Sequence, residues 1–297
     1  MVGNNSRRHE LLLDWYEHHQ RALPWRATDD AYSILVSEVM LQQTGVERVK
    51  KKYVEFLELF PDIETLAGAS SADVIRAWSP LGYNRRALNL KRTAELVVAE
   101  YRGQIPRDEE TLKSFPGIGP YTAAAVMAFA FHEDKAPVDT NISRILRRLF
   151  GIGRDVAKRE DALMAQKILP LGKASAWSQA LMDLGATICL PRKPLCHECP
   201  ILEYCDAAPK LIAGGDEDTA PKSSSPYVGS TRYYRGRIVE ALRGVPDGSS
   251  LGVLDLGHMI RDDFTSSDLN WLQLILFGLR EDGLIAIEDS GDVTLPV

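Results

Sequence analysis

The four cysteines of this 297-residue sequence fall in one short loop. Cys189, Cys196, Cys199 and Cys205 follow the spacing Cys-x6-Cys-x2-Cys-x5-Cys. Four thiolates at loop spacing can hold a 4Fe–4S cluster or a zinc ion, and buried structural thiols are the plain alternative. Zinc sites usually pair two close cysteine knuckles, whereas only Cys196 and Cys199 form one here. The uneven spacing therefore favours a 4Fe–4S cluster bound by all four cysteines.

A Gly-x-Gly turn, formed by Gly117 and Gly119, separates two expected helices near residues 109–114 and 121–131. Glycine permits a tight hairpin with positive φ, and amides at the start of the second helix can face a phosphate oxygen. This arrangement, a helix-hairpin-helix, binds a DNA backbone without reading its sequence. Because a Gly-x-Gly between helices is often only a turn, the motif needs support from other residues.

Two carboxylic acids stand out by their positions in the chain. Asp139 directly precedes an expected helix, where an N-cap is the ordinary role of an aspartate. Glu38 lies inside an expected helix; a solvated face is the ordinary explanation, but its neighbours leave little polar face. These apolar neighbours are Ile34, Leu35, Val39, Met40 and Leu41. Both acids are therefore candidate catalytic groups.

Taken in order, these segments resemble the helix-hairpin-helix DNA glycosylases that carry a C-terminal iron–sulfur loop. Among them, the sequence is most similar to the MutY-type adenine glycosylases, because Trp25-Arg26 and Gln42-Gln43-Thr44 favour this branch over the endonuclease III branch. The resemblance covers about residues 7–206. It rests on residues 23–26, 37–44, 81–83, 115–122, 138–141, 181–186 and the cysteine loop.

The resemblance implies a mechanism for the two acids. Such enzymes flip the target base out of duplex DNA. Glu38 would protonate the adenine at N7, which requires a carboxyl whose pKa burial raises towards neutrality. Asp139 would stay ionised and stabilise an oxocarbenium-like sugar, or attack it as a transient nucleophile.

The resemblance also implies roles for the remaining site residues. Tyr121 and Asn141 would support the acids. A lyase would carry a Schiff-base lysine at position 121, so the tyrosine implies a monofunctional enzyme. The residues implied in contacts with the base or the duplex are Trp25, Arg26 and Gln179 in the base pocket, Gln43 and Tyr83, which would enter the duplex around the partner base, Gln42 in DNA binding, and Gly117 and Gly119 in the hairpin.

The elements that must position these residues read as helices. We expect helices near residues 8–20, 32–43, 46–60, 72–78, 85–101 and 121–131, and no strand before residue 206. After Asn141, apolar residues recur at i, i+3, i+4 and i+7, and Arg144, Arg147 and Arg148 take the other face, where we expect them to meet phosphates. The fold class is therefore predicted to be all-α.

Three regions are expected along the chain. Residues 1–206 would form the glycosylase domain, with the cluster loop at 189–205. Residues 207–226 have the Gly, Ser, Pro and acidic composition of a mobile linker. Residues 227–297 would form a small winged-helix-like domain of helices near 231–242 and 267–281 and a hairpin over 284–295. They are too few and too helical for the Nudix-like domain that reads 8-oxoguanine in longer relatives.

The bulk composition is that of an ordinary globular protein. The net charge of −6 is uneven: residues 201–297 carry 8 Lys and Arg against 16 Asp and Glu. DNA binding depends on a local basic face, so this total neither supports nor excludes it. No apolar run is long enough for a signal peptide or a membrane span, and we expect a cytoplasmic monomer.

Three functional readings follow. The first is base excision repair, in which adenine is removed opposite 8-oxoguanine or guanine in duplex DNA. The second keeps the fold but changes the target to thymine or uracil opposite guanine. The third is a DNA-binding or damage-sensing protein without catalysis, against which the presence of both Glu38 and Asp139 argues. We favour the first.

Overall fold

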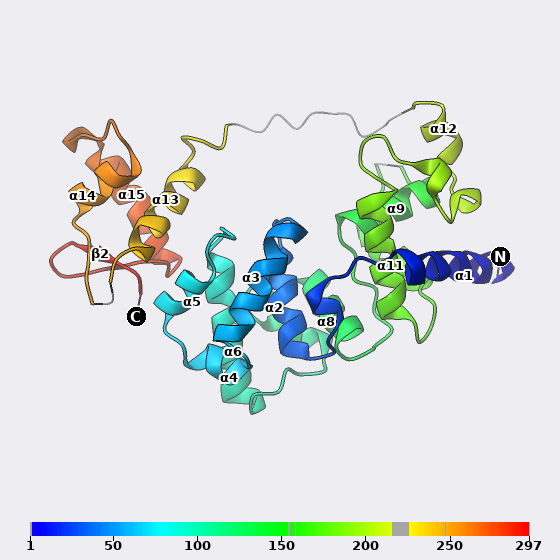
Figure 1. Cartoon of the computed structure of the whole chain (residues 1–297), viewed down its shortest axis with the longest axis horizontal. Helices are drawn as coiled ribbons and strands as arrows, with labels where there is room; N and C mark the ends of the chain where they lie inside the picture. Colours follow the sequence, from blue (N-terminus) through cyan, green and yellow to red (C-terminus); the bar gives the residue numbers. More distant parts are fainter. Residues whose placement is uncertain (1, 154, 158, 216–225, 247, 297) are drawn as a thin grey trace. The chain divides into compact units, whose positions relative to one another are not determined.

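The computed structural model describes residues 2–153, 155–157, 159–215, 226–246 and 248–296. Helices dominate this part of the chain (Figure 1), which confirms the predicted all-α class. Its two strands both lie after residue 206, as expected. The α-helices are α1 (Val2–His19), α2 (Ala31–Leu41), α3 (Val46–Leu59), α4 (Ile63–Gly68), α5 (Ser71–Ala77), α6 (Arg85–Tyr101), α7 (Glu109–Ser114), α8 (Pro120–Phe129), α9 (Thr140–Leu149), α10 (Arg159–Lys167), α11 (Ala174–Thr187), α12 (Ala208–Ile212), α13 (Thr231–Arg243), α14 (Val253–Ile260) and α15 (Leu269–Glu281).

Helix α9 shows how the sequence pattern becomes structure. The Asp139 side chain caps its start by accepting a hydrogen bond from the Ile142 amide. The predicted apolar stripe is buried, with Ile142 1% and Leu146 0% exposed. Two arginines in the last turn complement the negative end of the helix dipole. The helix is therefore fixed at both ends and along its inner face.

The described chain forms two compact units. The first unit contains residues 1–38, 106–114 and 118–221. In it α11 packs against α1, α8 and α9. Trp177 of α11 and Leu12 of α1 are almost fully buried, and α8 is buried from Thr122 to Phe129. This packing supports the segments that carry the two acids.

The second unit contains residues 39–105, 115–117 and 222–297. Helices α4 and α5 pack on α6, and α13, α14 and α15 pack on one another. The two strands, β1 (Ala286–Ile287) and β2 (Val293–Thr294), pair antiparallel after α15, and Leu251 bridges to Val293. Helices followed by a short hairpin match the winged-helix-like order expected from the sequence. One hydrophobic core joins this module to Ala72, Ile75 and Leu88 of α5 and α6.

The predicted linker is only partly described. Its first residues form α12, and residues 216–225 lie outside the described residues, so the expected mobility stays a prediction. Among the described helices, none has the length and apolar character needed to cross a membrane.

Candidate active site and DNA interface

Glu38 lies in the middle of α2 with only 4% of its surface exposed. Its Oε2 atom is buried and has no hydrogen-bond partner within the described residues. Burial raises the pKa of this carboxyl to about 7; a hydrogen bond from Tyr121 opposes the rise, the charge of Asp139 adds to it, and Arg26 opposes it. Glu38 is thus a carboxyl that holds its proton near neutral pH.

Asp139 has a different environment from Glu38. It accepts hydrogen bonds from the Ile142 amide at 2.7 Å and from Asn141 Nδ2 at 3.0 Å. Burial raises its pKa, while these hydrogen bonds and the nearby Arg144 act in the opposite direction. Asp139 therefore has two roles at once: it caps the start of α9, and its charge acts on Glu38.

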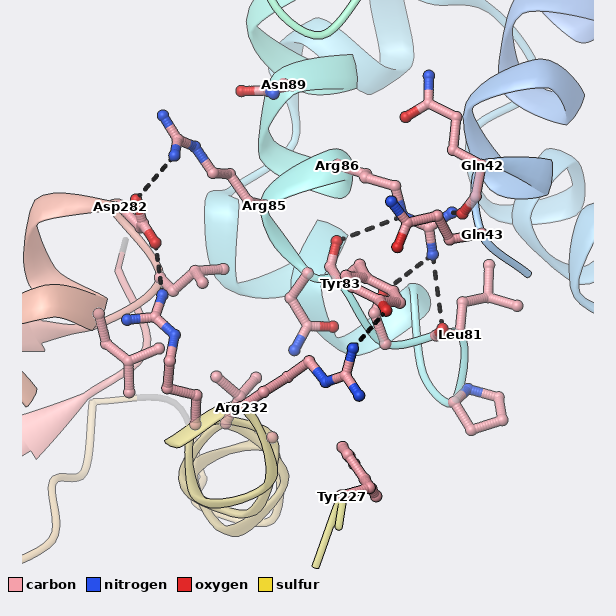
Figure 2. A pocket seen from close by; sticks show the side chains of 18 of the residues that line it. Gln42, Gln43, Leu81, Tyr83, Arg85, Arg86, Asn89, Tyr227, Arg232 and Asp282 are labelled. Carbon is pink, nitrogen blue, oxygen red and sulfur yellow. Dashed lines mark hydrogen bonds and ion pairs between the residues drawn. The ribbon is translucent and has the colours of Figure 1, made fainter. Parts of the chain in front are cut away.

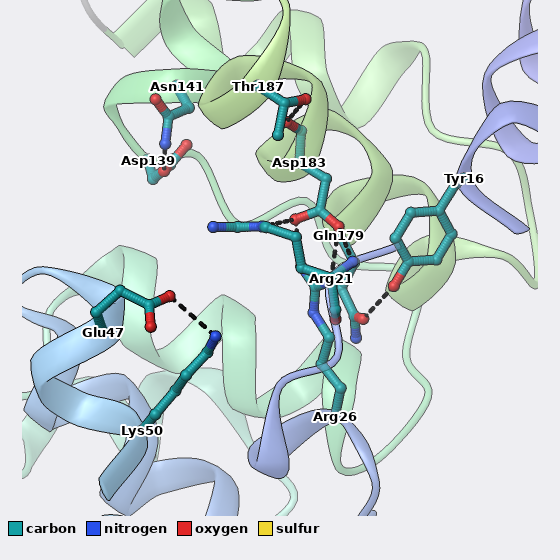
Figure 3. A network of polar contacts seen from close by, with 10 residues as sticks. All are labelled: Tyr16, Arg21, Arg26, Glu47, Lys50, Asp139, Asn141, Gln179, Asp183 and Thr187. Carbon is teal, nitrogen blue, oxygen red and sulfur yellow. Dashed lines mark hydrogen bonds and ion pairs between the residues drawn. The ribbon is translucent and has the colours of Figure 1, made fainter. Parts of the chain in front are cut away.

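Tyr121 and Asn141 complete the cluster around the two acids: Tyr121 forms a hydrogen bond with Glu38, and Asn141 donates one to Asp139 (Figure 3). Burial, followed by the charges of Glu38 and Asp139, raises the pKa of the Tyr121 phenol well above its usual value, so it stays protonated. Asn141 Oδ1 accepts a hydrogen bond from Arg144 at 2.9 Å, and Arg144 also donates to the Gly185 carbonyl at 2.7 Å. The structure thus brings all four residues that were expected to be catalytic together in one unit.

A small cavity of about 70 Å³ opens beside Glu38. Its walls include the three residues expected in the base pocket, Trp25, Arg26 and Gln179. Gln179 accepts a hydrogen bond from the Tyr16 hydroxyl at 2.7 Å, which fixes its amide (Figure 3). The cavity therefore combines an apolar wall with polar groups of fixed orientation.

Asp183 is a site residue whose role the sequence did not indicate. It is fully buried and accepts hydrogen bonds from both terminal nitrogens of Arg26, at 2.7 and 2.8 Å. The Arg21 Nε atom donates to it at 2.7 Å. Burial acts to raise the pKa of Asp183, but these arginines outweigh it and the pKa is lowered. Asp183 thus fixes the position of the Arg26 side chain. The feature of the sequence that could have indicated this role is an acid within the mainly apolar run 181–186.

Of the two hairpin positions, 117 and 119, only the first requires a glycine. Gly117 has φ +77°, and a Cβ there would lie 2.9 Å from Asn89 Nδ2, so both backbone conformation and space require glycine. Its carbonyl accepts a hydrogen bond from Gln42 Nε2 at 3.3 Å. Gly119 has φ −92° and open space around it, so the expected positive φ is wrong at this position. Gly119 caps α8 in extended backbone, which any residue can adopt.

Gln43 and Tyr83, expected to enter the duplex, both have positive φ, at 56° and 47°. Such values are uncommon outside glycine and need support from the surrounding structure. Arg86, 9% exposed, supplies this support by donating to the carbonyls of Val39 at 3.0 Å and Gly82 at 3.0 Å. Further donations reach Met40, Gln42, Thr44 and Tyr83.

The sequence did not indicate a role for Arg86, because its partners are mainly backbone carbonyls that only the fold brings together. Burial lowers its pKa to about 10. Gln42, Gln43 and Tyr83 lie in the second unit, whereas the acid cluster lies in the first. The predicted site residues therefore form two groups, each with its own scaffold.

The cysteine loop is folded by two short 3-10 turns, Cys196–Glu198 and Leu202–Tyr204. The pKa of Cys199 is raised to about 12, chiefly by burial; a hydrogen bond with the Ile201 backbone opposes the rise, and the charges of the other three cysteines add to it. Arg148 donates to Cys189 Sγ at 3.4 Å and to the Leu190 carbonyl at 2.7 Å. Four free cysteines in one loop, one of them beside an arginine, fit a thiolate-bound cluster, whose negative charge the arginine would offset.

The arginines of α9 have protein partners. Arg144 donates to the Cys189 carbonyl at 2.9 Å and Arg147 to Asp161 at 3.0 Å. These guanidinium groups thus support the cluster loop and neighbouring groups of the protein, and contact of this face of α9 with phosphates stays a prediction. Arg144 connects Asn141 to that loop.

Two family models match this chain. The HhH-GPD superfamily of base excision DNA repair proteins matches residues 36–170, and the iron–sulfur binding domain of endonuclease III matches residues 189–205. The fold and the site thus define a helix-hairpin-helix DNA repair enzyme with an iron–sulfur cluster domain at residues 189–205, the loop that contains the four cysteines.

Named relatives narrow this class. The adenine DNA glycosylase of Mycolicibacterium smegmatis is 38% identical over 291 residues, covering 96% of this chain and 97% of the relative. That of Mycobacterium tuberculosis H37Rv is 34% identical, covering 96% of this chain and 92% of the relative. The human adenine DNA glycosylase is 38% identical over 71% of this chain and 42% of its own. The chain belongs to the adenine DNA glycosylase family and acts in base excision repair of DNA.

Solved structures agree on the fold. A thermostable thymine-DNA glycosylase superposes with a TM-score of 0.65 and 33% identity, covering 69% of this chain and 98% of its own. An endonuclease III–DNA complex, 22% identical, superposes with a TM-score of 0.62 over 72% of this chain and 100% of its own, which shows the fold alone. The MutY-type resemblance, the adenine target and the iron–sulfur cofactor expected from the sequence are confirmed.

Proposed function

We propose that this adenine glycosylase is monofunctional and acts on adenine opposite 8-oxoguanine or guanine. One observation carries the mechanism: a buried carboxyl of pKa about 7 with an unpaired oxygen, Glu38, lies beside a second acid held by hydrogen bonds, Asp139. Two acids in opposed environments are what an N-glycosidic cleavage requires.

The adenine enters the cavity between Trp25 and Gln179 after leaving the duplex. Glu38 donates its proton to N7 of the base. The bond between C1′ and the base nitrogen then breaks, and its electron pair leaves with the protonated adenine. Asp139, as the carboxylate, stabilises the positive charge that develops on the sugar. A water molecule attacks C1′ and returns a proton to Glu38, which resets the acid.

Two further properties complete the proposal. Tyr121 offers a phenol rather than an amine near C1′, so no Schiff base forms and the abasic strand remains intact. The four cysteines would hold a 4Fe–4S cluster, which fixes the fold of residues 189–205. We also propose that the chain works as a cytoplasmic monomer.

Single-turnover assays on a panel of duplexes test the target. We expect adenine release opposite 8-oxoguanine and guanine, and little thymine or uracil release opposite guanine. Release of thymine with adenine untouched would contradict the proposal. Iron analysis should give about four irons per chain, whereas one zinc and no iron would contradict the cluster type.

Strand cleavage tests the monofunctional assignment. Product strands should break only after alkali or heat, and borohydride should trap little covalent complex. Y121K should gain measurable nicking if burial keeps the new amine uncharged. Neutral-pH nicking by the unmutated enzyme at the rate of base removal would contradict the assignment.

A further inference from the structure

A cavity of about 630 Å³ in the second unit takes no part in the proposed chemistry. We call it the arginine pocket. One wall carries Gln42, Gln43 and Tyr83, and the other carries Tyr227 and Arg232 from the C-terminal module (Figure 2). The two residues expected around the partner base thus share a cavity with a module of no assigned role.

Arg232 joins the two walls. Its NH1 atom donates a hydrogen bond to the Tyr83 hydroxyl at 3.0 Å. Its guanidinium carbon lies 5.9 Å from the Tyr83 ring centroid and 5.0 Å from the Tyr227 centroid, within cation–π range of both. Tyr83 is 44% exposed and its backbone has a positive φ, so Arg232 holds the side chain of a residue with an uncommon backbone conformation, and the ring remains accessible. A residue of the C-terminal module, Arg232, therefore holds Tyr83, a residue of the predicted DNA interface.

The arginine pocket is rich in positive charge, although the segment that supplies one of its walls is acidic. Among its lining residues, Asp282 is the one acid, and it pairs with Arg85 at 3.1 Å and with Arg235. The lining arginines are Arg48, Arg85, Arg86, Arg232 and Arg235. Residues 201–297 nevertheless carry twice as many acids as bases. Five arginines against one acid in the cavity itself indicate an anionic ligand.

We propose that the arginine pocket binds a nucleotide of the DNA strand that faces the target adenine. Arg232 would contact its phosphate, and the Tyr227 and Tyr83 rings would contact the base or sugar. Arginine only donates hydrogen bonds, which suits phosphate oxygens and the O6 acceptor that guanine and 8-oxoguanine share. The inference rests on the proposed function, because it takes the adenine to occupy the cavity beside Glu38.

Binding of the full chain with its cluster to fluorescent DNA tests this inference. The duplex carries an adenine nucleotide, made uncleavable by fluorine at the sugar 2′ position, opposite 8-oxoguanine or guanine. R232A should weaken binding about tenfold and reduce the slope of log K against log salt by about 0.9. R232K keeps the charge but not the planar stack on the tyrosine rings, and its affinity for the duplex should be about threefold lower. Y227A tests the aromatic wall and should also lose about threefold.

R280A is the matched control, because it removes one arginine from the same module at a position outside the pocket. Its guanidinium contacts only the neighbouring Phe277 ring and Glu281 within the described residues. We expect R280A to change the affinity for the duplex by less than about twofold. A single-stranded adenine oligonucleotide lacks the facing strand, so R232A and the parent should bind it alike.

Equal binding of the duplexes by R232A and R280A would overturn the inference. A tenfold loss on the single strand as well would also overturn it, because the pocket would then hold the adenine strand. Adenine release by the unmutated enzyme is measured separately. If release fails, the proposed function fails; if it proceeds while R232A binds normally, only the pocket assignment fails.

Discussion

At the scale of single residues, the chemistry of the site depends on the different environments of two carboxyl groups. Glu38 is buried among apolar side chains with one oxygen unpaired, whereas Asp139 accepts two hydrogen bonds at a helix start. Desolvation favours the neutral form of an acid, and hydrogen bonds to its oxygens favour the charged form. One acid is therefore suited to give a proton and the other to stabilise a cation.

Asp139→Asn should abolish most turnover and leave the fold intact. Asparagine is as good an N-cap as aspartate, so α9 should still start at the same residue. The stabilising charge is lost, and we expect the single-turnover rate to fall by about 10³-fold or more. Anisotropy should show that the duplex binds within about threefold of the parent. A rate within tenfold of the parent would contradict the role of Asp139.

Glu38→Gln should stabilise the protein at alkaline pH. The folded pKa of Glu38 is raised above its unfolded value, so the parent loses stability as pH rises from about 4.5 to about 7. The glutamine cannot ionise and avoids this cost, which amounts to roughly 2–4 kcal/mol above pH 8. Denaturant unfolding at pH 4.5 and 8 should show the difference appearing only at pH 8. An equal change in the free energy of unfolding at both pH values would contradict the assigned pKa of Glu38.

Elements determine how closely these residues approach one another. Helices α9 and α11 meet at Gly185, where a Cβ would lie 2.7 Å from the Asn141 Cβ. Asn141 in turn contacts Asp139. Glycine at this position allows α11 to approach the residue that supports the acid.

Gly185→Ala should therefore lower activity and stability together. The displaced Asn141 should carry Asp139 with it, and overpacking of this kind costs about 1–3 kcal/mol. Gly68→Ala is the matched control, because nothing lies within 4 Å of a Cβ there. The control should melt within about a degree of the parent or above it. Unchanged turnover by Gly185→Ala would show that α11 does not position Asn141.

The elements also show how far sequence reasoning reaches. Helix α6 begins and ends at the predicted residues, and the buried stripe of α9 follows its period. Short helices without a clear period, such as α4 and α14, were not predicted. Glu38 was found because an acid in an apolar helix is incongruous. Arg86 could not be found this way, since carbonyls from separate segments create its environment.

At the scale of the whole molecule, total charge is a poor guide to function. The chain is acidic overall, yet five arginines and a single acid line the arginine pocket. Binding to undamaged duplex should still weaken steeply with salt, with log K falling by about 0.9 per neutralised phosphate. Anisotropy titrations across a salt series measure this slope. A flat dependence would argue against DNA backbone binding.

The pH dependence of adenine release tests the central claim most directly. If protonated Glu38 activates the base, the single-turnover rate on a duplex with adenine opposite 8-oxoguanine should be highest at acidic pH. Above its pKa of about 7 the rate should fall about tenfold per pH unit. Glu38→Gln should be slower by about 10²–10⁴-fold and lose this titration. A Glu38→Gln enzyme with the parent rate and the parent pH profile would contradict the account.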